Sequence, residues 1–375
     1  MHILIAPNAF KNSLPADAAA AAISKGLDES QLSCTCTCFP VADGGDGTAA
    51  LLIKHLHGKI IDATVNDPQR RRINTSFGLI ENDETAVIEL ADASGLRLLQ
   101  PGEYDPLHAT TYGTGELIKF ALDKGVKKII MGIGGSATVD AGTGIMQALG
   151  IKFLDKKKDE LRNLPASLTE LEDIDITGLD KRIANTELII LCDVENFLLG
   201  AQGAASVFGP QKGASTGDVQ KLEACLTNIR DIVFQKTGKD MAAVKYGGAS
   251  GGVAAGLHAL LNAKLVNGID YFLAITGFDH LLQNADLVIT GEGSIDTQTL
   301  QGKGPFGVAK RAKEKSIPVI GMAGKVPLIH DRQLQEYFNV LLPINNEATG
   351  LKEAMENTEM NLIRTAVLLG NMLSM

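Results

Sequence analysis

Five stretches of the sequence place glycines beside carboxylates or a lysine where an apolar run ends. Glycine lets backbone N–H groups approach a ligand closely, carboxylates bind Mg²⁺, and an ammonium group binds phosphate oxygens. Phosphoryl transfer needs such placement and charge neutralisation more than covalent help from the protein. Five such loops in one chain therefore indicate a site that handles phosphate. They are PVADGGDGT (40–48), MGIGGSATVDAGTG (131–144), LCDVEN (191–196), FGPQKGAS (208–215) and VITGEGSIDTQTLQGKGPFGVAK (288–310).

The loop at 131–144 has two interpretations. Gly132, Gly134 and Ala137 fit the G-x-G-x-x-[GA] dinucleotide fingerprint, and Asp155 lies at about the 20-residue distance of a ribose-binding acid. However, Asp155 is followed directly by KKKDE, which is typical of a solvated strand end. The other four loops favour the second interpretation, an anion site. Its donors would be Gly134, Gly135 and Ser136.

The loop at 288–310 has the highest density of such groups. Its glycines supply backbone donors, two carboxylates suit Mg²⁺ and a lysine suits phosphate. It is not a Walker A motif, because Lys303 is followed by Gly304. The candidate residues are Gly291, Glu292, Gly293, Asp296, Gln298 and Lys303.

Single carboxylates and a lysine mark the remaining loops. Asp43 follows a predicted strand and is the better functional candidate, whereas Asp46 serves equally well as a helix cap, as does Thr48. Asp193 ends the run LIILC, where a general base or a metal ligand would be useful. Lys212 lies between glycines, where it either binds an anion or is an ordinary exposed turn lysine.

Composition excludes several other classes of function. With 35 basic and 44 acidic residues, the net charge is −9, which disfavours nucleic acid as a partner. No apolar stretch approaches the roughly 20 residues of a membrane span, so a cytoplasmic protein without a membrane partner is expected. The histidines and cysteines form neither a catalytic triad order nor a zinc pattern. A homo-oligomer is compatible with the sequence.

The elements that must position these loops follow an α/β pattern. Residues 1–57 alternate strand, helix, strand, helix, which predicts parallel strands with loops at their carboxyl ends. Residues 58–91 alternate in hydropathy like an antiparallel meander, and the end of the chain returns to strand and helix alternation. We therefore predict a Rossmann-like domain with a parallel sheet, formed by residues 1–57 plus 281–375. A second, mixed α/β domain, residues 58–280, would be inserted into it, with the active site in the cleft between the domains.

In order, the loops resemble the motif series of the bacterial glycerate kinase family. The segments FGPQKGA and GEG-x-x-D-x-Q are the most specific, and APNAFKNSL and GGASGGVAAGL complete the series. The resemblance implies transfer of the ATP γ-phosphate to D-glycerate with Mg²⁺. The product would be 2-phospho-D-glycerate rather than 3-phospho-D-glycerate, which would feed glycerate from glyoxylate or sugar-acid breakdown into glycolysis. Three residues depart from the family pattern: Asp46 for Glu, Ala141 for Gly, and Phe197 for Pro.

Roles for the individual residues follow from their chemistry and loop position. We predict that Asp193 accepts the proton of the attacking hydroxyl and that Lys11 and Lys303 neutralise the transferring phosphoryl group. The predicted metal ligands are Asp43, Glu292 and Asp296. The predicted substrate- or phosphate-binding residues are Gly134, Gly135, Ser136, Asn196, Lys212, Gly291, Gly293 and Gln298. A nicotinamide oxidoreductase and a non-catalytic sugar-acid sensor are the alternatives.

Overall fold

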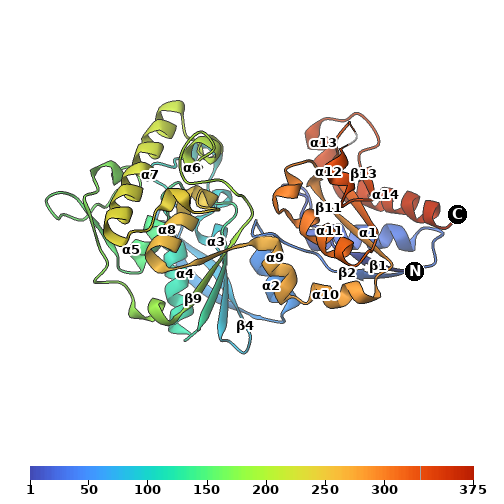
Figure 1. Ribbon diagram of the computed structural model, residues 1–375, viewed down its shortest axis with the longest axis horizontal. Coiled ribbons are helices and arrows are strands. Elements are labelled where there is room, and N and C mark those ends of the chain that lie inside the picture. The colour runs from blue at the N-terminus through green and yellow to red at the C-terminus, as the bar shows by residue number, and fades with distance from the viewer. Residues whose placement is uncertain (330) are drawn as a thin grey trace. The chain divides into compact units, whose positions relative to one another are not determined.

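The computed structural model describes residues 1–329 and 331–375, which divide into two compact units. The first unit comprises residues 1–43 and 268–375, and the second comprises residues 44–267. Both mix helices with sheets, as the α/β prediction required (Figure 1). Within the described residues, no helix is both long enough and apolar enough to cross a membrane.

The first unit is built on a five-stranded parallel sheet in the order β13-β12-β11-β1-β2. Its strands are β1 (His2–Ile5), β2 (Thr35–Cys38), β11 (Leu287–Ser294), β12 (Val319–Lys325) and β13 (Val340–Pro343). Its helices are α1 (Ala16–Asp28), α9 (Gly268–Ile275), α10 (Phe278–Leu281), α11 (Gly304–Glu314), α12 (Arg332–Gln335), α13 (Leu351–Glu356) and α14 (Thr358–Leu373).

Helices cover this sheet because its strands are apolar on both faces. Ile3 and Ile5 join the core formed with α1 and α14, while the buried Leu4 between them faces the other side. Helix α1 begins without a side-chain cap. Ser13, just before it, instead donates to the carbonyl of Met355 at 2.6 Å and to the hydroxyl of Thr358 at 2.7 Å.

The second unit contains a six-stranded mixed sheet in the order β10-β9-β6-β5-β4-β3. The predicted meander forms the antiparallel pairs β3·β4 and β4·β5, and the remaining pairs are parallel. The strands are β3 (Lys59–Asn66), β4 (Arg72–Ile80), β5 (Thr85–Glu89), β6 (Lys128–Gly132), β9 (Glu187–Cys192) and β10 (Lys264–Asn267), beside a separate antiparallel pair of β7 (Lys152–Leu154) and β8 (Asp173–Asp175).

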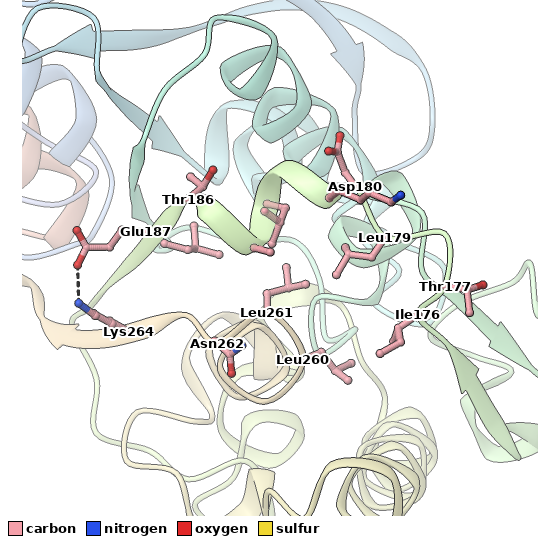
Figure 2. A pocket seen from close by; sticks show the side chains of 14 residues that line it. Ile176, Thr177, Leu179, Asp180, Thr186, Glu187, Leu260, Leu261, Asn262 and Lys264 are labelled. Carbon is pink, nitrogen blue, oxygen red and sulfur yellow. Dashed lines mark hydrogen bonds and ion pairs between the residues drawn. The ribbon is translucent and has the colours of Figure 1, made fainter.

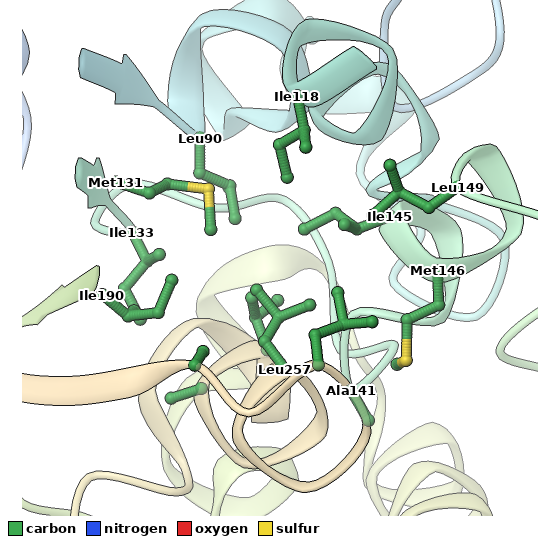
Figure 3. Packing of buried hydrophobic residues seen from close by; sticks show 14 of the residues in the cluster. Leu90, Ile118, Met131, Ile133, Ala141, Ile145, Met146, Leu149, Ile190 and Leu257 are labelled. Atoms are coloured by element: carbon green, nitrogen blue, oxygen red, sulfur yellow. The ribbon is translucent and has the colours of Figure 1, made fainter. Parts of the chain in front are cut away.

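Seven helices of the described chain belong to this unit, and several pack on the core of the sheet. They are α2 (Thr48–His55), α3 (Ala91–Ser94), α4 (Tyr112–Asp123), α5 (Thr143–Ala148), α6 (Ala204–Phe208), α7 (Thr216–Thr237) and α8 (Val253–Leu261). Figure 3 shows Ile118 of α4, Ile145 of α5 and Leu257 of α8 converging on the strand residues Met131 and Ile190.

The division of the chain differs from the predicted boundaries, 57/58 and 280/281. Helix α2 packs on β4 and β5, so the structure joins it to the second unit and begins that unit at Gly44. Helices α9 and α10 contact each other, and α9 packs on α11 of the first unit, which therefore resumes at Gly268. The composition shift at residue 58 marks the start of the meander rather than the start of the unit.

Candidate active site

In the first unit, three polar residues lie at the carboxyl edge of the sheet. Two of them, Asp43 and Glu292, are predicted site residues, and the third, Asn8, contacts Asp43. Asn8 follows β1, Asp43 follows β2, and Glu292 lies in β11, beside β1. The amide of Asn8 donates to Oδ2 of Asp43 at 2.9 Å, and the backbone N–H of Gly304, the first residue of α11, donates to the same oxygen at 3.1 Å. Asp43 is only 8% exposed, so these two hydrogen bonds are largely shielded from solvent.

Glu292 is the second buried carboxylate of this edge. Its Oε1 accepts a hydrogen bond from the hydroxyl of Thr299 at 3.1 Å. Burial and the neighbouring carboxylate of Asp43 raise the pKa of Glu292 to about 7, although the Lys303 ammonium opposes this shift. Asp296 contributes less freely, because its Oδ1 accepts the backbone N–H of Gln298 at 2.9 Å.

Carboxylate oxygens are the ligands that Mg²⁺ prefers, so the chemistry of Asp43 and Glu292 fits a magnesium ion. Their proximity fits as well, because two neighbouring buried carboxylates repel each other and a bound proton or cation relieves that repulsion. Among residues 1–329 and 331–375, however, no group of three or more His, Cys, Asp or Glu is arranged to hold a metal ion.

The other predicted residues of this unit occupy different settings. Lys303 is the N-cap residue of α11, and Lys11 is exposed in the turn after β1. Gly291 and Gly293 lie within β11. A Cβ on Gly291 would collide with the carbonyl oxygen of Met322 on β12, so its small size serves close strand packing.

Gln298 completes the predicted set in this unit. It is exposed, and it directly precedes a short 3-10 turn, Thr299–Gln301. The structure therefore brings Asp43 and Glu292 together most closely, with Lys303 and Asp296 nearby, and leaves Lys11 and Gln298 on the surface.

In the second unit, the glycines at 134 and 135 pack against the loop that precedes α2. The N–H of Gly134 donates to the carbonyl of Gly44 at 3.0 Å, so this donor is occupied within the protein rather than directed to an anion. Gly135 has a φ of +69°, and a Cβ there would collide with the carboxylate of Asp46. Packing within the protein is thus sufficient to explain why both positions are glycine.

Lys212 is not an exposed turn lysine. It is 3% exposed, and its Nζ donates to the hydroxyl of Ser136 at 2.7 Å and to the carbonyl of Thr138 at 2.6 Å. Burial lowers the pKa of Lys212 to about 7, and the negative charge of Asp140 opposes the shift. The structure therefore joins two predicted residues, Lys212 and Ser136, in one buried cluster.

Asp193 and Asn196 follow β9 at the carboxyl edge of the second sheet. Asp193 is half-buried and comes directly after the buried Cys192. The side-chain amide of Asn196 donates to the carbonyl of Gln202 at 2.8 Å, and its backbone carbonyl accepts from Gly248 at 2.8 Å. Asn196 thus also shapes its own loop.

Two buried acids of this unit escaped the sequence interpretation. Asp140 has no exposed surface and accepts hydrogen bonds from the backbone and hydroxyl of Thr111 and from the N–H groups of Gly142 and Gly144. It lies inside the loop at 131–144, where its position directly before Ala141 and Gly142 was the available signal.

Glu89 is the second of these acids. Its carboxylate accepts the N–H groups of Gly47 at 2.6 Å and Ala49 at 3.0 Å, so it caps α2 in place of Asp46 or Thr48. Burial raises its pKa to about 7. It ends a predicted strand just as Asp193 does, which was the signal available in the sequence.

A family comparison adds to this geometry. The model of the Glycerate kinase family matches residues 3–374. The chain belongs to the glycerate kinase family. It is 42% identical to the glycerate kinase of Bacillus subtilis (strain 168), over 98% of this chain and 96% of that protein. It is 41% identical to the glycerate 2-kinase of Escherichia coli (strain K12), over 95% of each chain.

A solved structure agrees with these glycerate kinase relatives. The crystal structure of a Salmonella typhimurium LT2 protein assigned as a glycerate kinase 2 matches with a TM-score of 0.83 and 40% identity. The match covers 100% of this chain and 98% of that one. The dinucleotide interpretation of the loop at 131–144 is therefore wrong for this kinase. Asp155, its distant acid, caps its own turn by accepting the N–H groups of Lys157 and Asp159.

The positions where the chain departs from the glycerate kinase pattern lie at loop ends. Ala141 is buried with a φ of 51°, a conformation in which glycine is the easier residue. Phe197 is 51% exposed on the loop after β9.

A pocket beside the second sheet of this glycerate kinase lies away from these loops. This pocket of about 430 Å³ opens at the amino-terminal ends of β9 and β10, where Lys264 and Glu187 form an ion pair at 2.5 Å (Figure 2). Thr186, Leu188 and Asn262 also line it. None of the predicted site residues does, so this pocket is separate from the candidate site residues of the second unit.

Proposed function

We propose that this protein transfers the γ-phosphate of ATP to the 2-hydroxyl of D-glycerate, giving 2-phospho-D-glycerate and ADP. The observation that carries the proposal is the full-length similarity to glycerate kinases, among them a protein whose name specifies the 2-kinase. The buried acidic and basic clusters support it, because phosphoryl transfer relies on positioned charges. We place the reaction in the cytoplasm, where it would supply glycolysis, without a nucleic-acid or membrane partner.

In the first unit, we assign the charge-neutralising groups. Asp43, Glu292 and Asp296 would hold Mg²⁺, which supplies positive charge to the phosphate oxygens of the bound nucleotide. Lys11 and Lys303 would neutralise the transferring phosphoryl group. Lys303 stands at the amino-terminal end of α11, where its ammonium and the helix dipole would attract the same phosphate, and it lies beside the buried Glu292.

We propose that the remaining phosphate contacts of this unit come from two glycines of β11 and one exposed side-chain amide. We assign them to Gly291, Gly293 and Gln298. Both glycines lie in a strand, where fewer backbone N–H groups are free to bind a ligand than in a loop. We therefore propose that they contribute mainly by lacking side chains, which lets the phosphates come close to the backbone.

In the second unit, we assign the general base to Asp193. A half-buried carboxylate at a strand end can accept the proton of the glycerate hydroxyl as the oxygen attacks phosphorus. The remaining assignment is binding of glycerate or of its phosphate ester. The residues are Gly134, Gly135, Ser136, Asn196 and Lys212, with Gly134 acting through its shape because its N–H is occupied.

The test measures ADP formation by the purified protein with ATP, Mg²⁺ and D-glycerate, with L-glycerate and D-lactate as matched alternatives. We expect ADP to form when D-glycerate is present and not to form when it is left out. The same mixture with NAD⁺ in place of ATP should show no absorbance change at the nicotinamide wavelength. Binding of D-glycerate without ADP release would instead support a sensor and overturn the proposal.

A further inference from the structure

The segment before α8 has a backbone conformation that calls for an explanation. Ser250, Gly251 and Gly252 adopt left-handed conformations in succession, with φ values of 55°, 67° and 90°. For serine this costs about 1–2 kcal/mol, and such strain concentrates at ligand-binding positions. The hydroxyl of Ser250 is buried and has no hydrogen-bond partner among the described residues.

This turn lies directly on the loop that carries Ser136 and Thr138. The carbonyl of Gly251 accepts the N–H of Ala141 at 3.0 Å, and a Cβ on Gly251 would collide with the carbonyl of Thr138. Figure 3 shows Ala141 beside Leu257 of α8, so the loop and the helix pack against each other. Thr138 has no exposed surface, and its Oγ1 also lacks a partner in the described structure.

Lys212 brings a positive charge to the same place. Its Nζ is 2.6 Å from the Thr138 carbonyl that Gly251 covers. Two of its three N–H groups are used, by Ser136 and Thr138, and no described residue accepts the third. Asp140 is the charged group that faces Lys212, but its oxygens already accept four hydrogen bonds from Thr111 and the glycines.

We propose that the hydroxyls of Ser250 and Thr138, together with Nζ of Lys212, bind the carboxylate of the hydroxy-acid substrate. The proposal rests on the proposed function and names the part of the substrate that this cluster recognises. Buried hydroxyls and an ammonium with a spare N–H are expensive to leave unpaired, and a carboxylate offers acceptors to all of them. Thr138 and Lys212 are buried, and Ser250 is half-buried.

The test removes each hydroxyl while preserving the backbone. Ser250→Gly keeps the left-handed conformation without strain, and Thr138→Val keeps the side-chain shape. Each should raise the Kd for D-glycerate, measured by calorimetry without ATP, by about 10- to 100-fold, the effect of one hydrogen bond to a charged group. KM for D-glycerate should rise in parallel, while KM for ATP should stay within about twofold of the wild-type value.

Thr143→Val is the matched control, because its hydroxyl is also buried and unpartnered among the described residues. Unlike Thr138, Thr143 accepts no hydrogen bond from Lys212 through any of its atoms. Thr143→Val should leave the Kd for D-glycerate unchanged. Equal weakening by this control would show a general loop effect and overturn the proposal, as would an increase confined to KM for ATP. Unchanged Kd in Ser250→Gly would overturn it even if Thr138→Val failed to fold. Wild-type binding of D-glycerate without turnover would refute the proposed function alone.

Discussion

Asp193 places a half-buried carboxylate directly after the buried end of β9. Because we propose that Asp193 is the general base, its removal should lower kcat by about 10²- to 10⁴-fold, the usual contribution of such a group. We expect this loss in Asp193→Asn, with little change in KM for ATP. The matched variant Asp155→Asn alters an acid that caps only its own turn and should keep normal turnover. Near-normal kcat in Asp193→Asn would remove Asp193 from the mechanism.

The proposed role of Glu292 as a magnesium ligand predicts that the magnesium requirement depends on pH. Burial beside Asp43 raises its pKa to about 7, so the carboxyl is protonated below that pH and cannot bind a cation. The Mg²⁺ concentration needed for half-maximal activity should therefore fall as pH rises from 6 to 8 through that pKa. Glu292→Gln should require more Mg²⁺ at every pH and lose this dependence. A requirement in the wild-type protein that does not vary with pH would count against Glu292 as a ligand.

Helix α2 is capped by a residue that is distant from it in the sequence. Glu89 caps its first turn from the end of β5 through Gly47 and Ala49. Glu89→Ala should lower the free energy of unfolding at pH 7 by about 1–2 kcal/mol, as loss of a helix cap does. Urea denaturation would measure this, with Glu84→Ala as the control. Glu84 forms an exposed ion pair with Lys127, and its loss should cost under about 1 kcal/mol. Equal losses would contradict the capping role.

Local sequence patterns predicted the elements better than their partners. The meander and the helix at α2 were visible from periodicity, because each pattern lies within one segment. The burial of Lys212 was not, since its acceptors lie 76 and 74 residues away in Ser136 and Thr138. The sequence around Gly291 predicts a backbone donor in a loop, whereas the structure shows that a side chain at this position would collide with the carbonyl of Met322. Met322 belongs to a different strand, so the local sequence does not reveal this contact. Contacts between segments decide such cases, and no spacing rule encodes them.

At the scale of the whole molecule, the second unit is one continuous segment with neighbouring ends. Gly44 packs against the carbonyl of Leu191, and Asn267 pairs with the adjacent Cys192. A unit with its own core and close ends can fold alone. Residues 44–267 expressed separately should unfold cooperatively in urea with native-like far-UV circular dichroism. A gradual, non-cooperative transition would show that the unit needs the rest of the chain.

The proposed reaction of the whole protein is phosphorylation of the 2-hydroxyl of D-glycerate. Phosphorus NMR of the product formed from ATP and D-glycerate tests it most directly, because the 2- and 3-phosphate esters give distinct spectra. We expect a single new ester resonance that matches authentic 2-phospho-D-glycerate and splits into a doublet through the one proton on C2. A 3-phosphate resonance, a triplet from the two protons on C3, or the absence of any new ester would contradict it.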